Sequence, residues 1–112
     1  MSQITTHILD TTKGKPAPGV TIILSKKEDT FWSEIARGKT NTDGRLSDLL
    51  PKETILKSGI YKMTFLTKEY FEREVIVTFY PLVDIIFEIT TAEHYHVPLL
   101  LNPFGYATYR GS

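Results

Sequence analysis

The chain is built from short runs in which apolar and polar residues alternate. The clearest run covers residues 59–67, where Tyr61, Met63 and Phe65 occupy every second position and Lys62 and Thr64 lie between them. An alternation of period two puts the three large apolar side chains on one face of a β-strand. We therefore expect a half-buried strand there, with its apolar face in the core.

Comparable runs recur along the chain and are separated by segments rich in turn-forming residues. Further strands are expected at residues 4–9, 20–25, 31–40, 75–80, 82–90, 94–101 and 104–110. Residues 46–50 fit either a short strand or a helical turn, and residues 68–73 fit a single helical turn. Asp43-Gly44 is a strong signal for a tight turn, and Asn102-Pro103 suits a hairpin connection. The pattern predicts an all-β fold, an antiparallel two-sheet sandwich of about eight short strands with one short helical turn.

Composition narrows the class of protein without revealing a function. Residues 1–112 are enough for one domain with a core of its own. Thirteen basic and thirteen acidic residues cancel, so bulk charge favours neither nucleic acid nor an anionic membrane. The first ten residues do not read as a signal peptide, and no apolar run approaches the roughly 20 residues of a membrane helix. Because there is no cysteine, disulfides and thiolate chemistry are excluded, and a reducing compartment is permitted. We expect a cytoplasmic protein by default.

All three histidines fall in expected strands. Strand alternation puts His7 on one face with Thr5, and puts His94 and His96 on a common face. A single strand histidine is more often half-exposed or bonded to a carbonyl than catalytic. Three imidazoles would also suit a zinc site, but a His-x-His pair without a fixed third ligand is a weak signal, and Glu93 is the only carboxylate close by. Strand order is not readable from these patterns, so they do not say whether His7 meets His96.

Two further groups of polar residues stand where a fold can hold them in place. Arg45 follows the Asp43-Gly44 turn, where its guanidinium either is solvated or holds a planar anion or a carbonyl through two parallel hydrogen bonds. The sequence finishes on Tyr109-Arg110-Gly111-Ser112, and the strand expected at 104–110 runs into this tetrapeptide. A strand that reaches Arg110 would keep these polar groups at a defined point, whereas most terminal residues fray. Both features suggest a site without identifying its chemistry.

Five short motifs carry a resemblance to a known family. They are Thr6-His7-Ile8-Leu9-Asp10, Pro16-Ala17-Pro18-Gly19-Val20, Thr42-Asp43-Gly44-Arg45, His94-Tyr95-His96-Val97-Pro98-Leu99-Leu100-Leu101 and Tyr109-Arg110-Gly111-Ser112. The first three resemble the transthyretin family, and the last two resemble one branch of it, the 5-hydroxyisourate hydrolases of purine breakdown. The terminal tetrapeptide is the most specific element, because the hormone-carrying transthyretins lack it and lack this set of histidines. The resemblance spans nearly the whole chain.

The resemblance implies a transthyretin-like sandwich that assembles as a homotetramer with its sites in a central channel. It implies hydrolysis of 5-hydroxyisourate to 2-oxo-4-hydroxy-4-carboxy-5-ureidoimidazoline in urate degradation, with this small molecule as the partner and with no cofactor or metal. Matched residue by residue, the family's site positions fall on His7, Arg45, His96 and the tetrapeptide at 109–112. His94 is expected to support the site.

The implied reaction opens a six-membered ring when water attacks a ring carbonyl. Catalytic roles are expected for His7, Arg45, His96 and Ser112, and substrate contacts for His7, Arg45 and Tyr109. The two histidines would position and activate water, and Arg45 would bind the polar edge of the ring and offset negative charge. Ser112 would hold water or orient a histidine, and Gly111 would let the backbone approach closely.

Three other functions compete with this hypothesis. A carrier of the same fold would bind a small aromatic ligand without reacting, but a hydrophobic channel gains nothing from two histidines, an arginine and a serine. A zinc hydrolase built on the three histidines would lose its activity to a chelator. A β-sandwich interaction module would tolerate the loss of its last residues.

Overall fold

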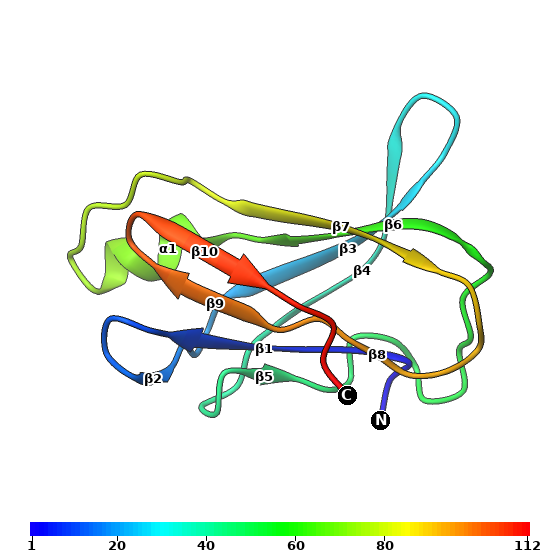
Figure 1. Cartoon of the computed structure of the whole chain (residues 1–112), viewed down its shortest axis with the longest axis horizontal. Coiled ribbons are helices and arrows are strands. Elements are labelled where there is room, and N and C mark those ends of the chain that lie inside the picture. Colours follow the sequence, from blue (N-terminus) through cyan, green and yellow to red (C-terminus); the bar gives the residue numbers. More distant parts are fainter.

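The computed structural model describes all 112 residues and consists of two β-sheets packed face to face (Figure 1). One sheet contains β3 (Thr21–Lys27), β4 (Trp32–Lys39), β6 (Gly59–Phe65) and β7 (Val83–Ile89) in the order β4-β3-β6-β7. The other contains β1 (Ile4–Asp10), β2 (Lys15–Pro16), β5 (Arg45–Leu46), β8 (Tyr95–His96), β9 (Leu99–Asn102) and β10 (Gly105–Thr108). Its order is β10-β9-β1-β2, with β5 and β8 also paired to β1. The expected two-sheet sandwich is confirmed.

Apolar side chains from the two sheets form one buried cluster. The alternation expected in β6 is confirmed, because Tyr61, Met63 and Phe65 are all buried. β1 contributes Ile4 and Ile8 to the same cluster. Since alternate residues of a strand point to opposite faces, β1 can fill the core with one set of side chains and carry polar groups on the other.

β1 is the centre of its sheet and is bordered by four short strands. β8 and β9 run parallel to it along one edge, and β2 and β5 run antiparallel along the other. The pairing is therefore not antiparallel throughout, because the chain crosses from β7 in the first sheet to β8 in the second and arrives in the direction of β1. The strand expected at residues 94–101 is divided into β8 and β9 at Val97-Pro98, where the proline has no N–H to donate.

The strand expected at residues 75–80 is wrong. The helical turn predicted just before it is confirmed as α1 (Thr67–Arg73), and the end of this helix turns the chain away from the sheets. Val75 takes a φ of 57°, and the N–H of Ile76 donates to the carbonyl of Phe71 at 2.9 Å. This is a Schellman ending, which needs one residue in the left-handed region. Residues 46–50, for which a short strand or a helical turn was expected, contain only the end of a strand. β5 stops at Leu46, and no helix follows.

The C-terminal strand is shorter than expected, because β10 ends at Thr108. The tail then bends so that Gly111 forms an isolated antiparallel bridge with His96, and its N–H donates to the His96 carbonyl at 2.9 Å. Met1 and Ser112 line a common hollow, and the two chain ends lie side by side in Figure 1. The tail is thus held by β8 and does not continue the pairing of β10 with β9.

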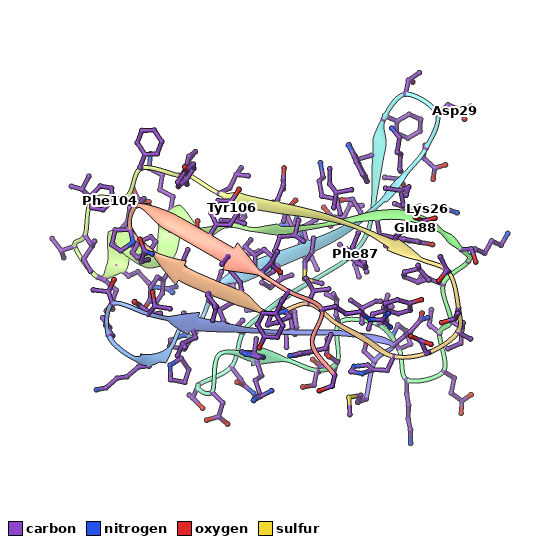
Figure 2. All side chains as sticks on the ribbon, viewed as in Figure 1. Lys26, Asp29, Phe87, Glu88, Phe104 and Tyr106 are labelled. Atoms are coloured by element: carbon purple, nitrogen blue, oxygen red, sulfur yellow. The ribbon has the colours of Figure 1, made fainter.

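A turn between two strands marks each end of the sandwich. Asp29 lies at the tip of the projecting β3–β4 hairpin, and Phe104 lies at the β9–β10 turn at the opposite end (Figure 2). No helix of the structure has the length and apolar character needed to cross a membrane.

Candidate active site

Three neighbouring strands bring the predicted polar residues together. β1 carries His7, and Arg45 of β5 stands directly opposite it in the strand register. On the other edge of β1, His96 of β8 stands opposite Thr5. Because Thr5 and His7 share a face of β1, side chains from all three strands meet on that face. The structure therefore unites His7, Arg45 and His96, which strand patterns alone left apart.

The position of Arg45 is fixed by the turn that precedes it. Gly44 has a φ of +69°, and a Cβ at this residue would lie 2.7 Å from the carbonyl oxygen of Ile8. The Asn41 side chain closes the turn by accepting the N–H of Arg45 at 3.0 Å. Only glycine fits both the left-handed backbone and the close approach, so the predicted Asp-Gly turn is confirmed. The Arg45 side chain itself is exposed beside His7.

The rings of His7 and His96 are joined by a direct hydrogen bond. Nδ1 of His7 lies 2.7 Å from Nε2 of His96, and the rings are stacked with centroids 4.9 Å apart. One nitrogen must donate and the other must accept, so a single proton occupies this contact. Two imidazolium rings could not share it. The pair therefore titrates as a unit that takes up its two protons in separate steps.

The surroundings keep both rings in their neutral form. Burial is the main cause that lowers the pKa of His7, and the positive charge of Arg45 lowers it further. Burial also lowers the pKa of His96, and the neighbouring charges of His7, His94 and Arg45 act in the same direction. A neutral imidazole keeps a lone pair and can accept a proton at neutral pH. This is the property that a general base needs.

The second ring nitrogen of His96 is held by Thr5. Nδ1 of His96 lies 2.7 Å from the Thr5 hydroxyl, and the same hydroxyl lies 2.8 Å from Nε2 of His94. The predicted common face of His94 and His96 is thereby confirmed. The three imidazoles do not surround a common point, however, and no group of three or more His, Cys, Asp or Glu side chains is placed to hold a metal ion. The geometry gives the zinc hypothesis no ligand set.

The C-terminal tail packs directly on His96. A Cβ at Gly111 would lie 2.5 Å from Cδ2 of the His96 ring, so the tail can bridge β8 at this point only because the residue has no side chain. Ser112 then lines a hollow of about 220 Å³ together with Arg45, His94, His96 and Thr5. No hydrogen bond joins the Ser112 hydroxyl to either histidine. The close backbone approach predicted for Gly111 is found.

Tyr109 lies on the other side of the tail. Tyr109 is 55% exposed and lines a second hollow of about 280 Å³ beside β7 together with Arg110. His96 lines this hollow as well as the one that contains Ser112. Arg110 pairs with Glu93 and stacks over the Tyr95 ring, 4.6 Å from the ring centroid. Within one chain Tyr109 therefore stands apart from the hollow that contains Arg45 and Ser112, and its contact with substrate stays a prediction.

Comparison with known proteins gives this geometry a family. The HIUase/Transthyretin family model matches residues 4–111. The chain belongs to this family. The 5-hydroxyisourate hydrolase of Salmonella typhimurium is 47% identical over 110 residues, which cover 97% of this chain and 80% of that protein.

Solved structures place the chain in the HIUase/Transthyretin family as well. The 5-hydroxyisourate hydrolase of Klebsiella pneumoniae has a TM-score of 0.86 and 36% identity, covering 97% of this chain and 98% of that one. Sea bream transthyretin in complex with thyroxine has a TM-score of 0.91 and 31% identity, covering 98% of this chain and 95% of that one. The backbone is thus shared by a hydrolase and a protein that binds thyroxine, so function must be argued from the side chains.

One residue of this family member was missed by the sequence reasoning. Strand alternation places Thr5 on the same face as His7 but assigns it no role. The signal was present in the parity of β1, since Thr5 and His7 are two residues apart on the face that also receives His96. The contact between Thr5 and His96 also depends on the register between β1 and β8, which could not be predicted from the sequence.

Proposed function

We propose that this protein hydrolyses 5-hydroxyisourate to 2-oxo-4-hydroxy-4-carboxy-5-ureidoimidazoline, and that the bonded pair of His7 and His96 activates the attacking water. The observation that carries the proposal is the 2.7 Å contact between the two rings, placed beside an exposed arginine. The relatives named as 5-hydroxyisourate hydrolases support the choice of substrate.

The histidine pair supplies the proton transfer that the reaction needs. Water gives one proton to the pair as its oxygen adds to a ring carbonyl, and the carbonyl oxygen becomes negatively charged. When the acyl C–N bond breaks, the pair returns that proton to the leaving nitrogen. The lowered pKa values of His7 and His96 keep the pair ready to accept the first proton. A positioned base of this kind is commonly worth about 10²- to 10⁴-fold in rate.

Arg45 is the group that we assign to the developing negative charge. Its guanidinium takes no part in an ion pair within the chain and stands across from His7 in the register. A planar fork of N–H donors suits the carbonyl edge of an oxidised purine better than the point charge of a lysine. We assign Ser112, on the wall of the same hollow, to holding the water. We assign Tyr109, which lines the neighbouring hollow beside β7, to a contact with the substrate.

The competing proposal is a carrier that binds a small aromatic ligand without reacting. It is favoured by the TM-score of 0.91 to a transthyretin solved with thyroxine. Against it stands the polar character of the hollow, of whose eight lining residues one is hydrophobic. A carrier gains little from desolvating two imidazoles and an arginine, because buried polar groups weaken binding of an apolar ligand.

We also propose that the protein works as a homotetramer in the cytoplasm and needs no cofactor. Light scattering on the purified protein should give a mass close to four times 12.8 kDa. A monomer with full activity would remove the tetramer from the proposal and leave the chemistry in place.

The deciding experiment follows the substrate directly. Urate oxidase generates 5-hydroxyisourate in the cuvette, and its ultraviolet decay is recorded with and without the protein. We expect strong acceleration by the wild type, before and after thorough treatment with a chelator, and none by a variant carrying both His7→Ala and His96→Ala. Binding of the substrate or of thyroxine without any acceleration would favour the carrier. Loss of activity on metal removal would revive the zinc hydrolase.

A further inference from the structure

The hydrogen bonds of the site do not end at the two catalytic histidines. His96 uses one ring nitrogen for His7 and the other for the Thr5 hydroxyl, and that hydroxyl also contacts His94. The three contacts measure 2.7, 2.7 and 2.8 Å and form one unbroken row of four side chains. One end of the row is His7, which is half-buried beside Arg45, and the other end is His94, which is exposed to solvent.

Each contact in this row holds one hydrogen, and together the hydrogens can point in either of two directions. In the first state the protonated Nδ1 of His7 donates to His96, the protonated Nδ1 of His96 donates to Thr5, and the Thr5 hydroxyl donates to Nε2 of His94. Nε2 of His7 then carries a free lone pair, and all three rings are neutral. This is the state in which His7 can accept a proton from water.

The second state follows from the first when Nε2 of His7 takes that proton. The hydrogen of His7 Nδ1 moves to His96, the hydrogen of His96 Nδ1 moves to Thr5, and the hydroxyl hydrogen moves to His94. One proton has been gained in total, Thr5 is again a neutral hydroxyl, and the positive charge rests on His94. Because every donor receives one hydrogen for the one it gives, the transfer needs no other reactant.

We propose that Thr5 and His94 are positioning residues that pass the proton taken from water out of the histidine pair to an exposed imidazole. This proposal rests on the proposed hydrolase function and adds a path for its proton. A positive charge next to Arg45 is unfavourable, whereas solvent stabilises it at His94. Glu93, which precedes His94 in the chain, forms an ion pair with Arg110, and Lys52 and Met1 line an open hollow with His94. The return path brings the same proton back for the leaving nitrogen.

The hydroxyl of Thr5 can be removed without changing the shape of its side chain. We expect Thr5→Val to lower kcat by about 10- to 100-fold with little change in KM, since a relay step rather than binding is lost. Thr5→Ser, which keeps the hydroxyl, should retain most of the activity. Thr78→Val is the matched control, because its hydroxyl donates to the Pro103 carbonyl far from the site. Wild-type kcat in Thr5→Val would overturn the proposal.

Small buffers separate a relay from a merely structural hydroxyl. Added imidazole at constant pH should raise kcat of Thr5→Val towards that of the wild type, because a mobile base can accept the proton that the broken row no longer carries. The wild type should not respond. A loss in Thr5→Val that imidazole does not restore would mean that the hydroxyl only supports the fold. An equal loss in Thr5→Ser, which lacks only the methyl group, would assign the effect to packing and would also overturn the relay.

His94→Gln tests the outer end on an exposed residue, so folding is not at risk. Glutamine can still donate to the Thr5 hydroxyl but cannot carry the proton, so kcat should fall by about tenfold and should be restored by imidazole. Unchanged kcat would show that His94 plays no part in the transfer.

The proton path can also be examined without any substrate. Nuclear magnetic resonance of protein with ¹⁵N-labelled histidine reports the protonated nitrogen of each ring. We expect the signals of the two ring nitrogens that face Thr5, Nδ1 of His96 and Nε2 of His94, both to change in Thr5→Val. If the wild type fails to hydrolyse 5-hydroxyisourate, the proposed function falls while this connection can still be observed. A His94 signal that does not change in Thr5→Val would overturn the relay alone.

Discussion

The two sheets of the sandwich divide the work of the protein between them. In the four-stranded sheet, β3, β6 and β7 each have seven residues and pair over long antiparallel registers. In the other sheet, β1 is paired with four strands of two to four residues each. Long strands build a continuous core face, whereas short strands let residues from many parts of the chain meet at one place.

The difference explains where the polar chemistry is found. His7, Arg45 and His96 come from three strands, of which two are only two residues long. Short strands contribute little pairing energy of their own, so turns and side chains must hold them, as Gly44 and Thr5 do. The four-stranded sheet has no such cluster and presents its buried side chains to the core. We expect substitutions in the two sheets to separate activity from stability.

The largest effect is expected on activity, at the histidine pair. His7→Ala, His96→Ala and deletion of residues 109–112 should each lower kcat/KM by at least about 10²-fold, with modest changes in thermal stability. The first two remove the proton acceptor, and the third uncovers His96 and removes Ser112. Decay of 5-hydroxyisourate and a melting curve measure the two quantities. Wild-type turnover by the deletion variant would show that the tail is not part of the site.

The opposite outcome is expected in the four-stranded sheet. Met63 is fully buried at the middle of β6, so Met63→Ala should lower the free energy of unfolding by about 2–5 kcal/mol because a cavity is left. Its kcat, measured well below the melting temperature, should stay close to that of the wild type. Ile35→Ala on an exposed position of β4 is the control and should change stability by less than about 0.5 kcal/mol. A large loss of kcat in Met63→Ala would break the division between the sheets.

The same contrast governs what the sequence predicts. β6 was readable because its alternation is long and its apolar face is complete. β2 was not, because two residues carry no periodicity, and the expected strand at 94–101 covers β8 and β9 without showing the break between them or their pairing with β1. The segment at 75–80 has strand-like residues, but the helix end at Val75 directs it away from the sheets. Of the candidate site, His7, Arg45 and His96 were found through a resemblance, whereas Thr5 needed the register.

A smaller effect on activity tests how closely the tail must approach β8. Gly111→Ala places a methyl group against the His96 ring, so the ring or the tail must move. A shift of this size should lower kcat by about 10- to 100-fold, since displacement of a catalytic group by about 1 Å has such a cost. Gly105→Ala in β10 is the control, because the nearest atom to its Cβ would be 3.6 Å away. Full activity in Gly111→Ala would mean that His96 tolerates a looser position.

The pH dependence of kcat/KM is expected to follow the histidine pair. Its acid limb should lie below 6.5, the ordinary pKa of histidine, because burial and Arg45 lower the pKa values of both rings. Arg45→Gln removes a positive charge, so it should raise these pKa values and move the limb to higher pH. Burial, the largest cause of the lowered pKa values, is unchanged in this variant, so they should not return fully to 6.5. The folded protein binds these protons more weakly than the unfolded chain, so the same groups lower stability as pH falls below 6.5. An acid limb that does not move in Arg45→Gln would separate Arg45 from the pair.

The smallest effect lies outside both sheets and changes stability alone. Val75 is 91% exposed and holds a φ of 57°, which is unfavourable for a β-branched residue but suits glycine at the end of a helix. Val75→Gly should therefore raise the free energy of unfolding by about 0.5–1 kcal/mol, because relief of the left-handed backbone exceeds the entropy that glycine adds to the unfolded chain. Val77→Gly is the matched control, since Val77 is also exposed but has no positive φ, and it should not stabilise. Chemical denaturation measures both, and kcat should not change in either variant because α1 and its end lie away from the histidines. A Val75→Gly protein less stable than the wild type would show that this valine makes a contact, with another subunit for example, that outweighs its strained backbone.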